Sequence, residues 1–360
     1  MNSADSFSAD FQSARAKFRE AARAVGATVE SLAHPERGPD GADLSTDVAL
    51  IGERGAERVL VMIAGTHGVE GFCGSGAQID WLRRGESSGL PKGVAVLMIH
   101  AINPYGFAWL RRVTEDNVDL NRNWVDFSSA LPANPGYDAL AGSAVPPEWT
   151  EAAQHDSARA LAIFAGEHGQ MALQQALSGG QYKHPTGIFY GGQAPTWSRR
   201  TQTAIFAEYL AGAARVGIID YHTGLGPFGY GEQIITDAPP NSGYERARSW
   251  YGAAITCPAS GTSTSADIKG DGLAAAPHLL AHAEVTGMAL EVGVQTLPET
   301  LGALRADAWL HANGDLASPQ GKEIKRAMRA AFYGDTDDWK GMVAGQSMLA
   351  CRQAIKGLTA

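Results

Sequence analysis

Apolar residues in the N-terminal segment recur at intervals of three and four positions, which is the spacing of one helix face. This periodicity predicts a helix over residues 7–26 that packs on a core. The residues that carry it are Phe7, Phe11, Ala14, Phe18, Ala21, Ala22 and Val25.

Further along, the apolar positions form short continuous runs. Runs of this kind are typical of strands that are covered on both faces, as in a parallel sheet under helices. They predict strands at 48–51, 59–63, 94–99, 216–220 and 288–292. The residues around Pro35, Gly38, Pro39 and Gly41 are predicted to form a loop.

Helical patterns alternate with these strands. They cover residues 76–84, 150–177 and 197–213, and Ser318-Pro319 is typical of a helix start, with serine as N-cap. Residues 126–149 are rich in Pro, Gly, Ala and Ser, and we interpret them as an excursion over the surface. The alternation predicts an α/β fold with a mixed, mostly parallel sheet and helices on both faces. We expect residues 1–360 to form a single domain, with C-terminal helices at about 318–355.

Composition and charge exclude several classes of protein. The formal charge of −9, with no basic cluster, disfavours a nucleic-acid-binding protein. Three scattered cysteines exclude a disulfide framework and a cysteine-rich zinc module. No apolar run approaches the ~18–20 residues of a membrane span, and residues 1–15 do not resemble a secretory signal. The sequence therefore predicts a cytoplasmic protein with no membrane partner.

A metal-binding pattern follows the strand at 59–63. The glycine-rich turn after it carries His67 and Glu70, and the strand at 216–220 leads to His222. Imidazole and carboxylate suit zinc, and three such ligands leave a fourth position for water, as in catalytic zinc sites. Asp220 is two residues before His222 and could accept the other N–H of its ring, although a strand-end aspartate can cap a turn instead.

A hydrolytic zinc site also needs a base and groups that hold the substrate. Glu291 is the best candidate base because it ends an apolar strand and precedes Val292-Gly293. Residues 110–124 are dense in charged and amide side chains, which is typical of a loop that faces a substrate.

In this order, the motifs resemble those of the carboxypeptidase A-like zinc metallopeptidases, a superfamily that also contains the aspartoacylase and succinylglutamate desuccinylase deacylases. The resemblance covers most of the chain, and the phrases around His67 and at 189–192 are more similar to an uncharacterised bacterial branch. It rests on His67-x-x-Glu70, Asn103-Pro104, Arg112, Val118-Asp119-Leu120-Asn121-Arg122-Asn123-Trp124, a strand-end histidine and Leu290-Glu291.

The resemblance assigns roles to the metal ligands and the base. It implies that His67, Glu70 and His222 bind one zinc ion. It makes Glu291 the general base that activates the zinc-bound water and later passes the proton to the leaving amine.

The resemblance also assigns the groups that bind the substrate. Arg112 matches the arginine that polarises the scissile carbonyl, with Arg111 as a possible substitute. Asn121 and Arg122 match the pair that binds a substrate carboxylate, because a guanidinium can bind two oxygens at once. The family's tyrosine over the substrate has no clear counterpart, since Tyr230, Tyr244 and Tyr251 are available but none carries a motif.

The sequence thus predicts a zinc-dependent hydrolase that cleaves an amide bond next to a free carboxylate, as a carboxypeptidase-like enzyme acting on a small peptide. Two alternatives stay open. One is an N-acyl amino acid deacylase of the aspartoacylase or desuccinylase type, and the other is a catalytically silent carboxylate-binding protein. The oligomeric state is left open.

Three other patterns are interpreted as structural. The G-x-G-x-x-G spacing at 224–229 lacks the following helix that a dinucleotide site requires. His278 and His282 are expected on one face of a helix, and Gly74-Ser75-Gly76 lacks the first glycine of a nucleophile elbow. Cys73 is expected to be a small buried residue, with metal contact as the lesser alternative.

Overall fold

The computed structural model describes residues 2–360. Its seven strands form one sheet in the order β1-β2-β4-β3-β5-β7-β6. The four central strands are parallel, whereas β1 and β2 on one side and β6 on the other run antiparallel to their neighbours. The strands are β1 (Thr28–Arg37), β2 (Asp43–Ile51), β3 (Arg58–Ala64), β4 (Val94–His100), β5 (Arg215–Phe228), β6 (Gly231–Ile234) and β7 (Glu284–Gly293).

Twelve α-helices accompany the sheet in the part of the chain from residue 2 onward. They are α1 (Phe11–Ala24), α2 (Gly71–Arg83), α3 (Pro104–Ala108), α4 (Pro135–Ala144), α5 (Glu151–His168), α6 (Gln170–Ser178), α7 (Trp197–Tyr209), α8 (Ser242–Tyr251), α9 (Gly272–Leu279), α10 (Leu297–Asn313), α11 (Pro319–Phe332) and α12 (Asp337–Leu358). The mixed, mostly parallel α/β fold predicted from the sequence is confirmed.

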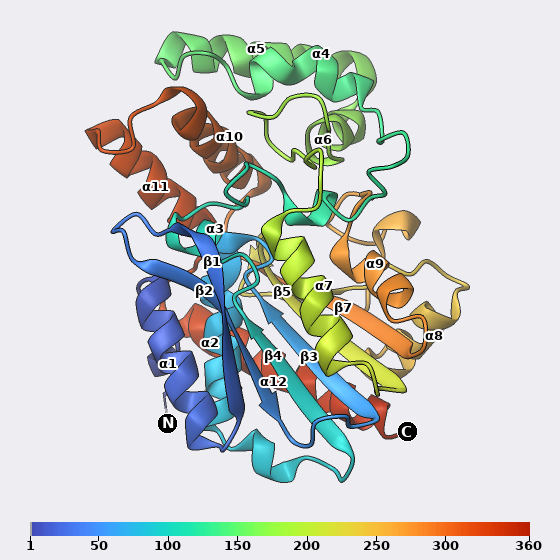
Figure 1. Ribbon diagram of the computed structural model, residues 1–360. Coiled ribbons are helices and arrows are strands. Elements are labelled where there is room, and N and C mark those ends of the chain that lie inside the picture. The colour runs from blue at the N-terminus through green and yellow to red at the C-terminus, as the bar shows by residue number, and fades with distance from the viewer. Residues whose placement is uncertain (1) are drawn as a thin grey trace.

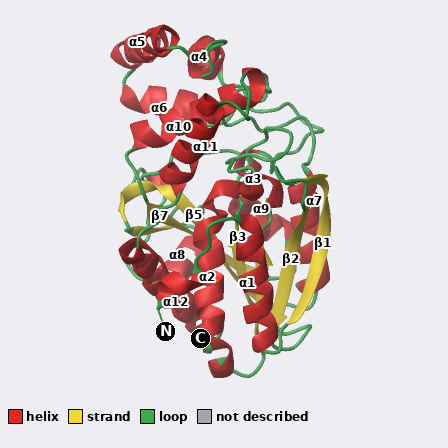
Figure 2. Ribbon diagram, turned by 90° about the vertical axis from the view of Figure 1, so that its left-hand side faces the viewer, coloured by secondary structure: helices red, strands yellow, loops and turns green. Residues whose placement is uncertain are grey.

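Helices cover both faces of the sheet (Figures 1 and 2). Phe18 of α1, Trp81 of α2 and Trp339 of α12 belong to the core on one face. Phe206 of α7 and Leu273 of α9 belong to the core on the other. Because the central strands are buried on both sides, their sequences contain apolar runs, and this is why the sequence predicts them.

A third hydrophobic cluster lies outside the two layers that cover the sheet. Helices α4, α5, α6, α10 and α11 gather at the top of the molecule as Figure 1 shows it, and their apolar side chains pack together. This cluster includes Tyr137, Leu177, Leu304 and Phe332, and it reaches Val69, next to the predicted ligand Glu70.

The helices at the ends of the chain have somewhat different bounds from those predicted. The N-terminal helix spans Phe11–Ala24 rather than 7–26, because Asp10 accepts a hydrogen bond from the Ser13 N–H and starts the helix there. Phe7 is nevertheless buried against the same core. At the other end, Ser318 caps α11 as predicted, and α12 continues to Leu358.

Three local features differ in detail from the sequence prediction. The segment 126–149 contains α4, which Asn134 caps by accepting from the Tyr137 N–H. The helical stretch 150–177 is two helices, because Gly169 adopts a φ of +93° between them. The loop expected around Pro35 is partly strand β1, whose mostly exposed side chains give no apolar run.

Strand β5 also extends further than residue 220. It continues to Phe228, with an irregular pairing to β7 between Thr223 and Phe228. The G-x-G-x-x-G spacing therefore lies in an extended segment, and strand β6 follows it instead of a helix. This arrangement offers no helix N-terminus to a dinucleotide pyrophosphate.

The buried His100 predicts a loss of stability in acid. Its ring stacks on Phe18 at 4.4 Å, and burial lowers its pKa to about 4. Because only the unfolded chain takes up a proton between pH 6.5 and 4, the free energy of unfolding should fall as the pH drops through this window. From pH 7 to pH 5 the loss attributable to His100 is about 2 kcal/mol.

Urea denaturation at pH 7 and pH 5 measures this effect. The H100Q variant should lose less stability between the two pH values than the wild type. The H278Q variant, which changes an exposed histidine, should lose as much as the wild type. Equal losses in the wild type and H100Q would contradict the prediction.

Candidate active site

The predicted metal ligands come from two neighbouring strands, at the level where β3 ends and β5 continues. Strands β3 and β5 pair in parallel, so the segments after Ala64 and around His222 meet at the same edge of the sheet. His67 follows β3 through a tight turn, and Glu70 ends the 3-10 turn Gly68–Glu70 just before α2. Gly68 is required in this turn, because a Cβ there would lie 2.0 Å from the backbone of Gly106.

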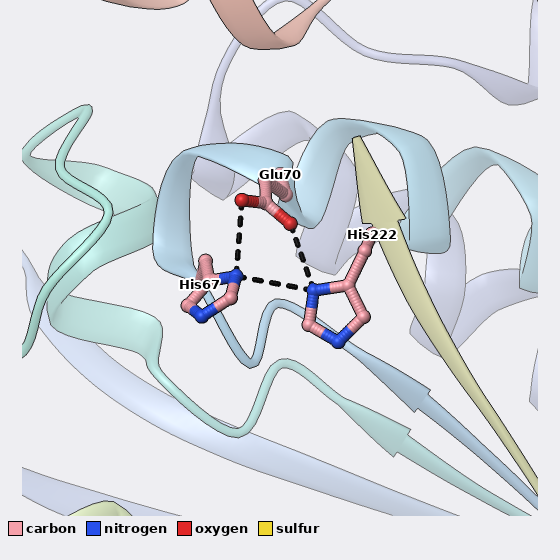
Figure 3. A group of neighbouring side chains, drawn as sticks. All are labelled: His67, Glu70 and His222. Carbon is pink, nitrogen blue, oxygen red and sulfur yellow. Dashed lines mark hydrogen bonds and ion pairs between the residues drawn. The ribbon is translucent and has the colours of Figure 1, made fainter. Parts of the chain in front are cut away.

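Three side chains converge at this edge (Figure 3). His67 Nδ1 lies 3.1 Å from His222 Nδ1 and 3.0 Å from Glu70 Oε1. His222 Nδ1 lies 2.9 Å from Glu70 Oε2. All three residues are buried. Each therefore offers one ligand atom to a common point between them.

The Nε2 atom of each ring, which is not the atom that faces the other ligands, contacts a carboxylate. His222 Nε2 lies 2.9 Å from Asp220 Oδ2, and His67 Nε2 lies 3.2 Å from Asp119 Oδ1. A ring that donates its Nε2–H to a carboxylate keeps the lone pair on Nδ1, so both lone pairs point at the central position. Asp220 is fixed in turn by the Thr66 hydroxyl, which donates to its Oδ1 at 2.8 Å.

This donor set fits a divalent metal ion. Two imidazole lone pairs and a carboxylate face one another within about 3 Å, and without a cation they would repel. Ligand atoms on a tetrahedral zinc ion, at ~2.0–2.2 Å from the metal, are spaced by about 3.4 Å, close to the spacing found here. Burial alone would lower the pKa of His222, yet the charges of Asp220 and Glu70 raise it, so the site favours positive charge.

Asp119 contacts several residues of this site, although the sequence predicted no role for it. Its carboxylate accepts from Arg112 Nε at 2.9 Å and from the Asn121 N–H at 2.9 Å, besides its contact with His67. Burial raises the pKa of Asp119, but the positive charges of Arg112 and Arg122 lower it well below its usual range. Asp119 thus joins a metal ligand to the loop that carries the predicted substrate-binding residues.

The structure separates the roles of the two neighbouring arginines. Arg112 lines the cleft and donates from Nη1 to Glu70 Oε1 at 3.0 Å. Arg111 points elsewhere, because its Nε donates to Asp307 at 3.0 Å and its Nη2 donates to Asn117 at 2.7 Å. The possible substitution of Arg111 for Arg112 is therefore not supported by the geometry.

Arg122 and Asn121 also line the cleft. Arg122 is buried, donates from Nη1 to the Asn121 carbonyl at 2.9 Å and from Nη2 to the Ser178 carbonyl, and lies over the Phe189 ring. Among residues 2–360 no atom accepts a hydrogen bond from its buried Nε. A buried guanidinium with an unused donor is suited to an anionic ligand.

Glu291 lies beside the converging ligands. It is paired in register with His222 on the adjacent parallel strand, so both side chains project from the same face of the sheet. Its Oε1 accepts from the Leu225 N–H at 3.0 Å. Burial, and then the charge of Glu70, raise the pKa of Glu291 to about 7, which is suited to proton transfer near neutral pH.

These groups open into one cleft of about 760 Å³, a size that holds a small-molecule ligand. Of the described residues, no tyrosine lines it. Tyr230 is exposed, Tyr251 is buried in the core, and Tyr244 packs against that core. None of the three is placed to cover a substrate.

The remaining sequence patterns lie outside the converging group. Helix α9 ends at Leu279, so His282 is beyond it rather than on a shared helix face with His278, and its ring contacts the Leu210 carbonyl. Cys73 is buried on α2, and burial together with the charges of Glu70 and Glu291 raises the pKa of its thiol. A protonated thiol is a poor metal ligand.

Comparison with known protein families assigns the sequence to one of them. The model of a family described as "Protein of unknown function (DUF2817)" matches residues 7–346. The chain belongs to the DUF2817 family. No curated protein matches the sequence.

Solved structures with a similar fold include members of the carboxypeptidase-like superfamily. Carboxypeptidase A from Helicoverpa armigera is 12% identical, with a TM-score of 0.50 over 97% of this chain and 74% of that chain. A succinylglutamate desuccinylase from Silicibacter is 11% identical, with a TM-score of 0.41 over 85% and 65% of the two chains. An aspartoacylase family protein from Mesorhizobium loti is 15% identical, with a TM-score of 0.37 over 79% and 67%. The likeness to carboxypeptidase A shows that the DUF2817 protein has a carboxypeptidase-like fold. In the described part of the chain, no helix is both long and apolar enough to cross a membrane.

The contact between Asp220 and His222 predicts a measurable effect on metal affinity. The D220N variant keeps the shape of the side chain but removes its charge, so we expect zinc to bind about 10- to 100-fold more weakly. Competition with a chelating dye measures the affinity. Asp138 makes a similar contact with His184 away from the cleft, and D138N should bind zinc as the wild type does. Unchanged affinity in D220N would refute the role of this carboxylate.

Proposed function

We propose that this DUF2817 protein is a zinc-dependent hydrolase that cleaves an amide bond next to a free carboxylate, in a small peptide or an N-acyl amino acid. The observation that carries the proposal is the convergence of His67, Glu70 and His222, together with a second carboxylate, Glu291, which lines the same cleft as the two histidines. The fold that the chain shares with carboxypeptidase A supports the same class of reaction only at the level of architecture.

In the proposed reaction the residues of the chain hold the substrate and move one proton. A bound zinc ion would supply a Lewis acid at the scissile carbonyl. Arg122 and Asn121 bind the carboxylate, and Arg112 faces the carbonyl oxygen. Glu291 takes a proton from the attacking water, whose oxygen bonds to the carbonyl carbon. When the C–N bond breaks, Glu291 returns the proton to the leaving amine, and the products are a carboxylic acid and a free amine.

A substrate panel tests the proposal. It contains small peptides with a free C-terminus, N-acyl amino acids, and the C-terminal amide of each compound. We expect hydrolysis of free acids and little of their amides, loss of activity after chelation, and recovery on addition of zinc.

The panel also separates the alternatives. Preference for peptides or for N-acyl amino acids distinguishes a peptidase from a deacylase. Binding of free acids without hydrolysis by the zinc-loaded protein would refute the proposal and favour a silent carboxylate-binding protein.

A further inference from the structure

One side of the cleft is formed by side chains that carry no charge. We define the apolar wall as Leu225, Leu297, Pro298, Leu301, Leu304 and Phe332, all of which line the cleft. Leu304 and Phe332 belong to the cluster of the upper helices, and Leu301 packs against it. Leu173 and Leu177 of α6 extend this surface. The cleft-lining residues of α6, α10 and α11 include no Asp, Glu, Lys, Arg or His.

The apolar wall begins directly at the reactive groups. The Leu225 N–H is the donor that holds Glu291. The Thr223 hydroxyl donates to the Phe332 carbonyl at 2.7 Å, and a Cβ on Gly224 would lie 3.0 Å from the Phe332 ring. The wall therefore packs against the strand segment that immediately follows His222.

This placement indicates which part of a substrate meets the wall. In the proposed reaction the carboxylate is bound at Arg122 and Asn121, and the scissile carbonyl lies between Arg112 and Glu291. The portion beyond the carbonyl then extends past Glu291 and Leu225 along the wall. That portion is the acyl group, whereas the carboxylate belongs to the leaving amino acid.

The chemistry of the wall disfavours two kinds of acyl group. A second carboxylate that lies against the wall, as in a succinyl group, would lose hydration, and the lining residues of α6, α10 and α11 offer it no cation. A longer peptide would find few partners for its backbone hydrogen bonds, because α10 and α11 use most of their own N–H and C=O groups within the helices. An aliphatic chain needs no polar partner and gains free energy from burial.

We therefore infer that the acyl group is a medium or long aliphatic chain, so that the substrates are N-acyl amino acids with apolar acyl groups. This inference rests on the proposed function and specifies its substrate class. Hydrolysis would release an aliphatic carboxylic acid and a free amino acid, with water as the only co-reactant.

The test compares N-acetyl-, N-hexanoyl-, N-decanoyl- and N-succinyl-L-alanine as substrates of the zinc-loaded protein. Each buried methylene contributes roughly fourfold. Partial burial of the decanoyl chain should then raise kcat/KM at least about 100-fold over acetyl, and succinyl should be the poorest substrate. Equal values across the series, or a preference for succinyl, would overturn the inference and leave the proposed function standing.

Variants of the wall supply the control. L301R places a cation on the wall, so it should lower kcat/KM for the decanoyl compound and raise the succinyl-to-acetyl ratio at least about tenfold. L301S, a milder change, should reduce only the decanoyl-to-acetyl ratio of kcat/KM. Leu349 on α12 is an exposed leucine outside the cleft. L349R should leave the decanoyl-to-acetyl and succinyl-to-acetyl ratios unchanged. Unchanged ratios in both Leu301 variants would contradict the inference.

A binding measurement separates the two proposals. The E291Q variant, in which turnover should be strongly slowed, can be titrated with N-decanoyl- and N-succinyl-L-alanine by calorimetry. If no compound is hydrolysed by the wild type, the proposed function fails, and the binding ratio then tests whether the apolar wall binds an aliphatic chain. At least tenfold tighter binding of the decanoyl compound supports the apolar wall, and equal binding or none refutes it.

Discussion

Replacing Glu291 by glutamine should lower turnover by about 10²–10⁴-fold while the protein keeps its metal. Glutamine has nearly the same shape and can still accept the hydrogen bond from the Leu225 N–H. It cannot take the proton of the attacking water. The raised pKa of Glu291, about 7, gives the native carboxylate a proton affinity close to that needed at neutral pH.

Turnover and metal content should be measured on the same E291Q sample. Glu284 is an exposed glutamate on the same strand, close to Arg215 and Arg246, and E284Q should keep wild-type turnover. If E291Q turned over substrate at the wild-type rate, Glu291 would not be the base. Loss of metal together with activity would indicate a role in binding rather than in proton transfer.

Replacing Arg122 by methionine should lower kcat/KM for substrates with a free carboxylate by about 10²–10³-fold, because a buried charge-assisted contact is lost. The effect on the corresponding C-terminal amides should be much smaller. The kcat/KM of R122K for free acids should lie between the values of the wild type and R122M, since lysine keeps the charge but not the planar fork of donors. The ratio of free acid to amide is the measurement, and it cancels any general loss of activity.

Thermal unfolding shows whether R122M keeps its fold, because Arg122 also bonds the Ser178 carbonyl. If R122M is too unstable to assay, the acid-to-amide ratio of R122K alone tests whether Arg122 binds the carboxylate. An unchanged acid-to-amide ratio in a folded variant would mean that the carboxylate binds elsewhere in the cleft.

Much of the sheet could be predicted from the sequence, because burial on both faces leaves a local signature. Strands β3 and β4 are almost entirely apolar, and β7 contains the short apolar run at 288–290. The positions of His67, His222 and Glu291 near the ends of the predicted strands indicated a shared edge. Strand β1 has no such signature, since it lies at the edge of the sheet with mostly exposed side chains. Helix α4 was not predicted, because its segment is rich in proline and glycine, although Asn134-Pro135 is a typical N-cap and first helical position.

The contacts that complete the candidate site could not be predicted in this way. Asp119 reaches His67 across 52 residues of sequence, and its loop has no periodicity that would place it. Two signals marked the segment, namely its density of charged and amide groups and the motif that contains Asp119, but neither indicated a contact with His67. The apolar wall joins residues of β5, α10 and α11, and no local pattern brings such distant segments together.

The central claim is that His67, Glu70 and His222 bind one divalent ion, and metal analysis of the purified protein tests it most directly. Metal content per chain should be determined for the wild type, for H67A and H222A, and for H184A, whose histidine lies outside the cleft. We expect about one zinc ion per chain in the wild type and in H184A, and almost none in H67A and H222A. A folded wild-type protein that takes up no zinc, or that keeps its metal when His67 and His222 are replaced, would contradict the claim.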